Sequence, residues 1–136
     1  MDNIFELINN YKTKKTKRVF NKIVKLTSKR LDYLSSICFK YKGLNVFDDI
    51  FWCDWWELED ISDITETDIE FYARHVYDGE YDEIIVPFRW FTMSDEEFLN
   101  DIRTKKIENI NKKIEKLEKK IITYNNLKTE LENIKF

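Results

Sequence analysis

The side chains that most often carry catalysis are scarce in this chain of 136 residues. It has one histidine, His75, and two cysteines, Cys38 and Cys53. A catalytic triad of Cys53, His75 and an acid is one arrangement to consider, because carboxylates flank both residues in the sequence. No sharp turn presents Cys53, however, and His75 falls on the apolar register of a predicted strand. We therefore expect a structural histidine, and we interpret the cysteines as small buried hydrophobic residues.

Acidic residues have the spacing of a metal loop at one place, Asp78, Glu80 and Asp82. A calcium loop would need glycine where Glu83 stands and a bidentate glutamate where Arg89 stands. One histidine and two cysteines are too few for a zinc site. Two glycines leave no phosphate-binding loop or nucleophile elbow. We expect a protein that is not an enzyme and that binds no cofactor or metal.

Charge divides the chain into three blocks. Residues 1–43 carry eleven Lys and Arg against three Asp and Glu, residues 44–93 carry fourteen acids against Arg74 and Arg89, and residues 94–136 carry ten basic and nine acidic residues. The formal net charge of −3 hides this segregation. We interpret the blocks as a basic helical segment, an acidic aromatic-rich β-meander and a long C-terminal helix, together one structural domain with a helical arm.

The third block predicts one uninterrupted helix. Ser94 can cap its first turn with Glu97 completing a capping box, and neither Gly nor Pro occurs between Ser94 and Phe136. A rod of about 40 residues is roughly 60 Å long, which a small domain cannot bury along its whole length. Apolar residues step by three and four along this helix, as in the seam of a coiled coil: Ile107, Ile110, Ile114, Leu117, Ile121 and Tyr124.

Two partners can cover that seam. The basic block predicts a helix from Thr16 to about Gly43, and its antiparallel packing on the C-terminal helix would form a helical hairpin. The alternative is a coiled coil between copies of the chain, and the two can coexist. Residues 2–11 predict a short amphipathic helix that either precedes the longer one or continues into it. The seam of the basic helix comprises Phe20, Val24, Thr27, Leu31, Leu34, Cys38 and Tyr41.

The acidic block predicts β structure. Polar and apolar residues alternate over 69–77 and 84–90 around a polar turn, which is typical of a β-hairpin. Residues 55–64 predict a first strand, residues 45–54 a short helix, and Pro87 an edge strand or a bulge. The expected fold class is α+β: a small antiparallel three-stranded meander packed on helices, with a long C-terminal helix forming a helical hairpin or coiled coil.

The one-sided charge of the acidic block indicates a binding function. A solvated strand face normally mixes lysine with glutamate, whereas no lysine occurs between Lys42 and Lys105. Such a block attracts a basic surface, for example a nucleic-acid-binding groove, and tryptophans can anchor the interface. The ordinary alternative is a sheet with acids outward and aromatics inward. The candidate partner-binding residues are Asp48, Asp49, Asp54, Glu57, Glu59, Asp60, Asp63, Trp52, Trp55 and Trp56.

In composition, residues 44–93 resemble the DNA-mimicking inhibitors that phages use against restriction or RNA-guided nucleases, which share no common fold. The excess of Lys, Ile and Asn also suits an AT-rich phage, plasmid or bacterial genome. The resemblance implies a small inhibitor that occupies the basic surface of a host defence nuclease. The rival interpretation is a structural or assembly protein that forms a homodimer or larger oligomer through its C-terminal helix.

The surroundings of such a protein can also be predicted. No apolar stretch is long enough for a membrane span, and a chain with two cysteines and no secretory signal suits the bacterial cytoplasm. The basic run at residues 12–30 could contact phosphates. Direct nucleic-acid binding is not our expectation, because the aromatics that could stack on bases lie in the acidic block.

Overall fold

The computed structural model describes residues 3–41, 44 and 56–136. The chain forms two units, residues 1–99 and 100–136. The first unit combines the basic and acidic blocks with the start of the C-terminal helix, and the second continues that helix. A three-stranded antiparallel sheet with helices confirms the predicted α+β class. The helix predicted over 45–54 lies outside the described residues.

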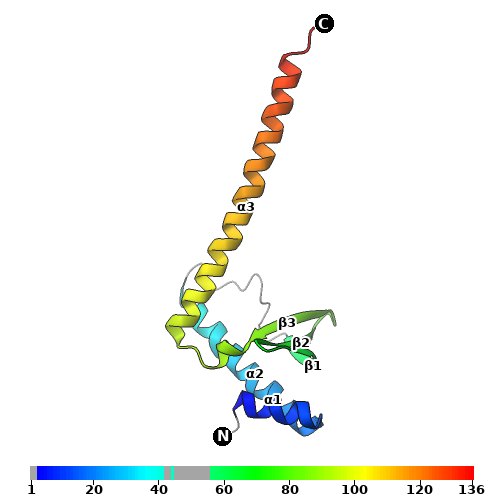
Figure 1. The fold of residues 1–136 in the computed structure, drawn as a ribbon, viewed down its shortest axis with the longest axis vertical. Helices are drawn as coiled ribbons and strands as arrows, with labels where there is room; N and C mark the ends of the chain where they lie inside the picture. Colours follow the sequence, from blue (N-terminus) through cyan, green and yellow to red (C-terminus); the bar gives the residue numbers. More distant parts are fainter. Residues whose placement is uncertain (1–2, 42–43, 45–55) are drawn as a thin grey trace. The chain divides into compact units, whose positions relative to one another are not determined.

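Two separate helices open the first unit (Figure 1). The side chain of Asn3 caps α1, Ile4–Thr13. The Thr16 hydroxyl then accepts the backbone N–H of Val19 at 3.3 Å and caps a new helix, α2, Lys17–Cys38. The short helix therefore precedes the long one and does not continue into it.

The apolar stripe of α2 is close to the predicted seam. Its buried residues recur every three or four positions and therefore lie on one side of the helix, as in an amphipathic helix. The prediction fails at the ends, because Ile23 is buried instead of Val24 and Tyr41 is exposed beyond the end of the helix. Gly43, the predicted stop, lies outside the described residues. The buried residues of the stripe are Ile23, Thr27, Leu31, Leu34 and Cys38.

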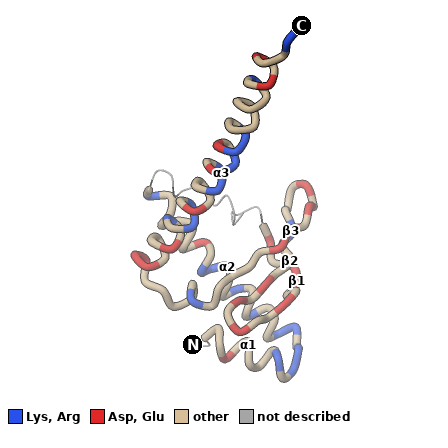
Figure 2. The backbone as a smooth tube through the Cα atoms, turned by 45° about the horizontal axis from the view of Figure 1, so that its top comes forward, with Lys and Arg blue, Asp and Glu red and all other residues tan. Residues whose placement is uncertain are grey.

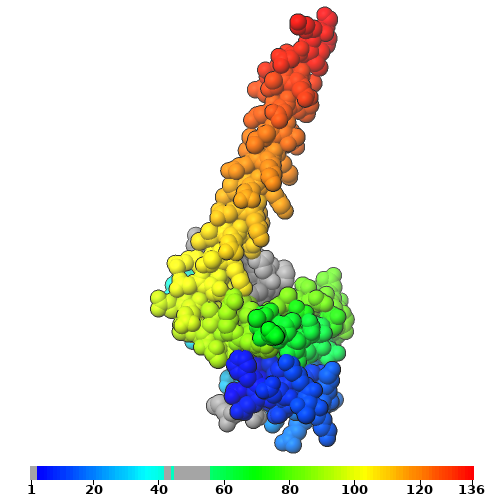
Figure 3. Space-filling view, in the orientation of Figure 1, coloured from blue at the N-terminus to red at the C-terminus, as the bar shows by residue number. Residues whose placement is uncertain are grey.

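The strands form the predicted meander. Strand β1 is Trp56–Ile64, β2 is Asp68–His75 and β3 is Tyr81–Pro87, in the order β1-β2-β3 with antiparallel pairing throughout. Pro87 ends β3, which is an edge strand, as expected for a residue without a backbone N–H. Figure 3 shows the green strands directly against the blue helix α1.

The chain leaves the sheet earlier than predicted. We expected the last strand to continue through Trp90, but a 3-10 helix, η1, occupies Phe88–Phe91. Pro87 cannot donate to the ladder, and the turn directly after it carries Trp90 into the core, where the side chain is 1% exposed. The Trp90 ring packs edge-to-face on Phe98, with ring centroids 5.3 Å apart.

An arginine on α2 fixes the segment between η1 and the last helix. The Arg30 guanidinium donates to the carbonyl oxygens of Trp90 at 2.6 Å and of Met93 at 2.9 Å. It also lies 5.4 Å from the centre of the Tyr33 ring, and the Tyr33 hydroxyl donates to the Asp95 carboxylate at 2.6 Å. That hydrogen bond raises the pKa of Tyr33 above its ordinary value.

The last helix, α3, begins as predicted. The Ser94 hydroxyl accepts the backbone N–H of Glu97 at 3.2 Å, and α3 runs without interruption over Asp95–Glu132. Phe98, in its first turn, is fully buried. Among the described helices, none combines the length and the apolar composition that a membrane span requires.

We predict that Arg30→Ala destabilises the first unit by about 2–3 kcal/mol, because hydrogen bonds to charged groups contribute roughly that much and two carbonyl oxygens lose their donor. Urea unfolding followed by tryptophan fluorescence measures the change. The matched control is Lys29→Ala, which removes an exposed cation from the same helix and should cost less than about 0.5 kcal/mol. Equal losses in the two variants would show that the arginine contributes through helix charge alone.

Candidate protein-interaction surface

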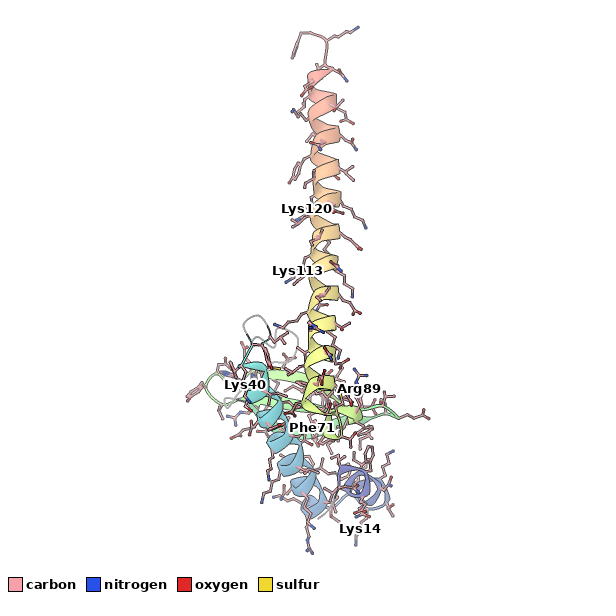
Figure 4. All side chains as sticks on the ribbon, turned by 90° about the vertical axis from the view of Figure 1, so that its left-hand side faces the viewer. Lys14, Lys40, Phe71, Arg89, Lys113 and Lys120 are labelled. Carbon is pink, nitrogen blue, oxygen red and sulfur yellow. The ribbon has the colours of Figure 1, made fainter. Side chains whose placement is uncertain are left out.

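Side chains alternate along β2, so its buried and exposed residues identify the inner and the outer face of the sheet. On the inner face Ile69, Phe71 and Ala73 are 0% exposed. Phe71 is labelled within the sheet in Figure 4. The intervening residues of β2 occupy the outer face. The acidic residues can bind a partner only if they lie on this face.

Two β-bulges put the acids of β1 on that outer face. The register shifts between Leu58 and Asp60 and again between Ile61 and Asp63. Each shift inserts one extra residue opposite a single partner, so the same face returns after three residues instead of two. The inner face of β1 therefore takes Leu58, Ile61 and Ile64, and the outer face takes Glu57, Asp60 and Asp63.

The cross-strand pairs extend this arrangement over the whole sheet. We define the acidic face as six carboxylates around one arginine: Glu57, Glu59, Asp60, Asp63, Glu70 and Glu83, with Arg74. It has three rows, which are Glu57–Arg74–Tyr81, Asp60–Tyr72–Glu83 and Asp63–Glu70–Ile85. Figure 2 shows red segments, which are Asp and Glu, along the three strands.

Backbone groups hold two of these carboxylates in place. The Asp60 carboxylate accepts the N–H of Ile61 at 2.8 Å, and Asp63 accepts the N–H of Ile64 at the same distance. The two bulges thus use the same local hydrogen bond. Arg74 lies 3.9 Å from Glu59 across the bulge and is too far away for a strong ion pair.

Aromatic and apolar side chains are exposed among the carboxylates. Tyr72 is 43% exposed, Tyr81 65% and Ile85 50%, and all three lie on the outer face of the sheet. Tyrosine is enriched at the centres of protein interfaces because it buries a large area and has a polar end. The acidic face therefore combines charge with side chains that can anchor a partner.

Of the three candidate tryptophans the structure describes Trp56, and it lies away from the acidic face. Trp56 pairs with His75 across β1 and β2, and their rings meet edge-to-face at 5.1 Å. Alternation places Trp56 on the face opposite to Glu57. It is half-buried against the histidine and does not anchor the acidic face.

His75 itself ends β2 and contacts the hairpin turn between β2 and β3. Its Nδ1 atom lies 3.0 Å from a carboxylate oxygen of Asp78, and the same carboxylate accepts the N–H of Glu80 at 2.9 Å. Gly79 closes the turn with a φ of 72°, a left-handed conformation that favours glycine. In the described part of the chain no three His, Cys, Asp or Glu side chains converge as a metal site would require.

Basic residues border one end of the acidic face. A cavity of about 280 Å³ separates the end of α1 from the bulged part of β1, and its lining includes Lys12, Lys15 and Asp63. The Lys15 ammonium lies 6.0 Å from the centre of the Tyr11 ring. Part of the basic run thus lies next to Asp63, and the acidic face continues from there toward Glu57 and Glu83.

The sequence identified only part of this surface. The structure brings together four predicted residues, Glu57, Glu59, Asp60 and Asp63, whereas five others lie outside the described residues: Asp48, Asp49, Trp52, Asp54 and Trp55. We missed the contribution of β2 and β3, namely Glu70, Tyr72, Tyr81, Glu83 and Ile85. Their alternation with buried residues was visible in the hairpin pattern and would have placed them on one face.

We predict that Glu70→Lys stabilises the protein by about 0.2–1 kcal/mol at low salt, because Glu70 lies directly opposite Asp63 and like charges at such pairs are destabilising. Urea unfolding at low and high salt measures this, and the gain should shrink as salt screens the repulsion. Glu66→Lys, with the same charge change in the exposed β1–β2 turn, is the control and should gain less. A loss of stability in Glu70→Lys would show that the outer face is not electrostatically crowded.

Comparison with known proteins adds no further constraint on this surface. No family model, curated protein or solved structure matches the chain. The seam predicted on α3, from Ile107 to Tyr124, has side chains that are 46% to 68% exposed. The acidic face and this exposed seam are the surfaces from which we propose a function.

Proposed function

We propose that the protein is a non-enzymatic inhibitor whose acidic face binds the basic, nucleic-acid-binding surface of another protein, as a DNA mimic does. The observation that carries the proposal is the acidic face itself, six carboxylates around Arg74 on one side of a sheet. A solvated face without a binding role would mix charges of both signs. Here, Glu70 lies beside Asp63 with no lysine on any of the three strands.

Carboxylates can replace phosphates chemically at such a surface. Arginine binds both groups through two parallel hydrogen bonds, so a groove lined with arginine for DNA also accepts a fixed array of carboxylates. The array on this sheet is preorganised, because the strands are hydrogen-bonded and Asp60 and Asp63 are held by backbone N–H groups. Preorganisation lowers the entropic cost of binding.

The exposed side chains between the carboxylates support a protein partner over a small ion. Tyr72 lies between Asp60 and Glu83 in the central row, and Ile85 closes the neighbouring row. Charge complementarity steers association and gives specificity, whereas buried aromatic and apolar contacts supply much of the affinity. A host defence nuclease of the restriction or RNA-guided class has a basic, nucleic-acid-binding surface and is present in the bacterial cytoplasm.

The proposal predicts that the chain displaces double-stranded DNA from such a purified nuclease, and that Glu57→Lys with Glu83→Lys weakens displacement at least about tenfold. Neither carboxylate holds a bulge, so the sheet should remain folded. A fluorescence competition assay measures displacement, and plaque counts of phage on cells that carry the nuclease measure inhibition. Displacement should also weaken steeply with salt.

The matched control is Glu66→Lys with Glu80→Lys, which makes the same change in net charge in the two turns beside the sheet. It should keep at least about half of the displacement activity, because exposed charges away from an interface act mainly at long range and are screened. Equal losses in the two double variants, or displacement insensitive to salt, would contradict a role for the acidic face.

A second candidate function is homo-oligomeric assembly through α3. The observation that favours it is the exposure of the predicted seam, where Ile114 is 46% and Tyr124 68% exposed. Exposed apolar residues in a row at coiled-coil spacing mark an interaction site. The two functions are compatible, because they use different surfaces of the chain.

A further inference from the structure

The second unit has an exposed apolar stripe that the acidic face does not explain. Its six residues remain 46% to 68% exposed, although each is large and apolar. The stripe alone does not specify its occupant. The charges beside it carry that information, because in a coiled coil the residues flanking the seam set partner choice and orientation. The stripe comprises Ile107, Ile110, Ile114, Leu117, Ile121 and Tyr124.

Heptad positions can be assigned from the steps of three and four. Ile107, Ile114 and Ile121 occupy position a, and Ile110, Leu117 and Tyr124 occupy position d. The flanking g positions are then Lys106, Lys113 and Lys120, and the flanking e positions are Asn111, Glu118 and Asn125. Figure 4 labels Lys113 and Lys120, which two helical turns place on the same side of α3.

This pattern distinguishes the two orientations of a helix pair. In a parallel pair each g residue faces the e residue of the next heptad, so Lys113 of each chain would meet Glu118 of the other. In an antiparallel pair g residues face g residues, and Lys113 would meet Lys120. The parallel arrangement therefore gains two opposite-charge pairs, whereas the antiparallel one gains two like-charge pairs.

We propose that a second copy of this chain covers the seam in a parallel, in-register, two-stranded coiled coil over residues 107–124. The inference rests on the second of the proposed functions and is independent of the acidic face. Ile at every a position with Leu117 at the central d position suits two strands. Lys113 and Glu118 act as the orientation-determining pair.

A lysine supports the register as well. The next a position is Lys128, which lies 3.8 Å from Glu132 of its own helix. In register, the two copies of Lys128 meet only at the open end of the seam, where water reaches them. A shift by one heptad would bring Lys128 against Ile121 of the partner subunit, and a polar residue at an a position opposes such mispairing.

Sedimentation equilibrium of the full chain tests the orientation. We expect the parent to reach the mass of a dimer with increasing concentration. Lys113→Glu and Glu118→Lys should each raise the dimer dissociation constant about three- to tenfold, and the double variant should restore it to within about twofold. The matched control is Lys116→Glu, at an outward c position, which should change the constant less than about twofold.

The outcomes separate the inference from the function on which it rests. A parent that stays monomeric at high concentration overturns both self-association and the parallel pair. A dimer that Lys113→Glu tightens, because Lys120 of the partner subunit faces the new carboxylate, overturns the parallel orientation and leaves self-association standing. A mass of three or more copies overturns the two-stranded arrangement alone.

Disulfide cross-linking provides an independent readout of register. Position 117 meets its own copy at a d layer of the parallel pair, within the reach of a disulfide. Leu117→Cys should therefore form a covalent dimer on mild oxidation, whereas Lys119→Cys, on the outward face, should form several-fold less. The parent chain, oxidised alongside, reports the contribution of Cys38 and Cys53. Equal yields in the two variants would overturn the register.

Discussion

The acidic face depends on two extra residues in β1. Without the register shifts after Leu58 and after Ile61, strict alternation would send Glu57 and Asp60 to opposite faces and would turn part of the apolar set toward water. With the shifts, a pattern that repeats every three residues gives the strand one acidic face and one apolar face. The bulges also disturb an exposed edge, which discourages pairing with other sheets.

The sheet can present its outer face only while its apolar inner face is buried. Phe71 and its neighbours are buried in the first unit, and Trp90 reaches the same core only because the chain leaves the sheet directly after Pro87. Arg30 donates hydrogen bonds to the carbonyl oxygens of Trp90 and Met93 and so holds the turn. Phe98 packs against the Trp90 ring. The inner face of the sheet is thus packed in the core, which preorganises the outer face for the binding role that we propose.

The two proposed interaction surfaces belong to different units of the chain. The acidic face belongs to the first unit and uses fixed carboxylates, with Tyr72 as the exposed aromatic of its central row. The α3 seam belongs to the second unit and uses aliphatic side chains, with Lys113 and Glu118 as flanking charges. The proposed partner of the first is a basic surface, whereas the proposed partner of the second is the same amphipathic helix of another copy. Dimerisation through α3 would double the acidic face and raise avidity for a dimeric target.

Local rules predicted most of the described elements, although they extended the last strand beyond Pro87. Alternation, caps and steps of three and four predicted the meander, the start of α2 at Thr16 and the start of α3 at Ser94, because each depends on a few neighbouring residues. They also indicated that the centre is acidic. Which carboxylates of β1 share a face with those of β2 was decided only by tertiary structure, since a bulge arises from pairing with β2. Pairing between strands also placed Glu83 beside Tyr72 and Trp56 against His75, and no local pattern specifies which residues meet in this way.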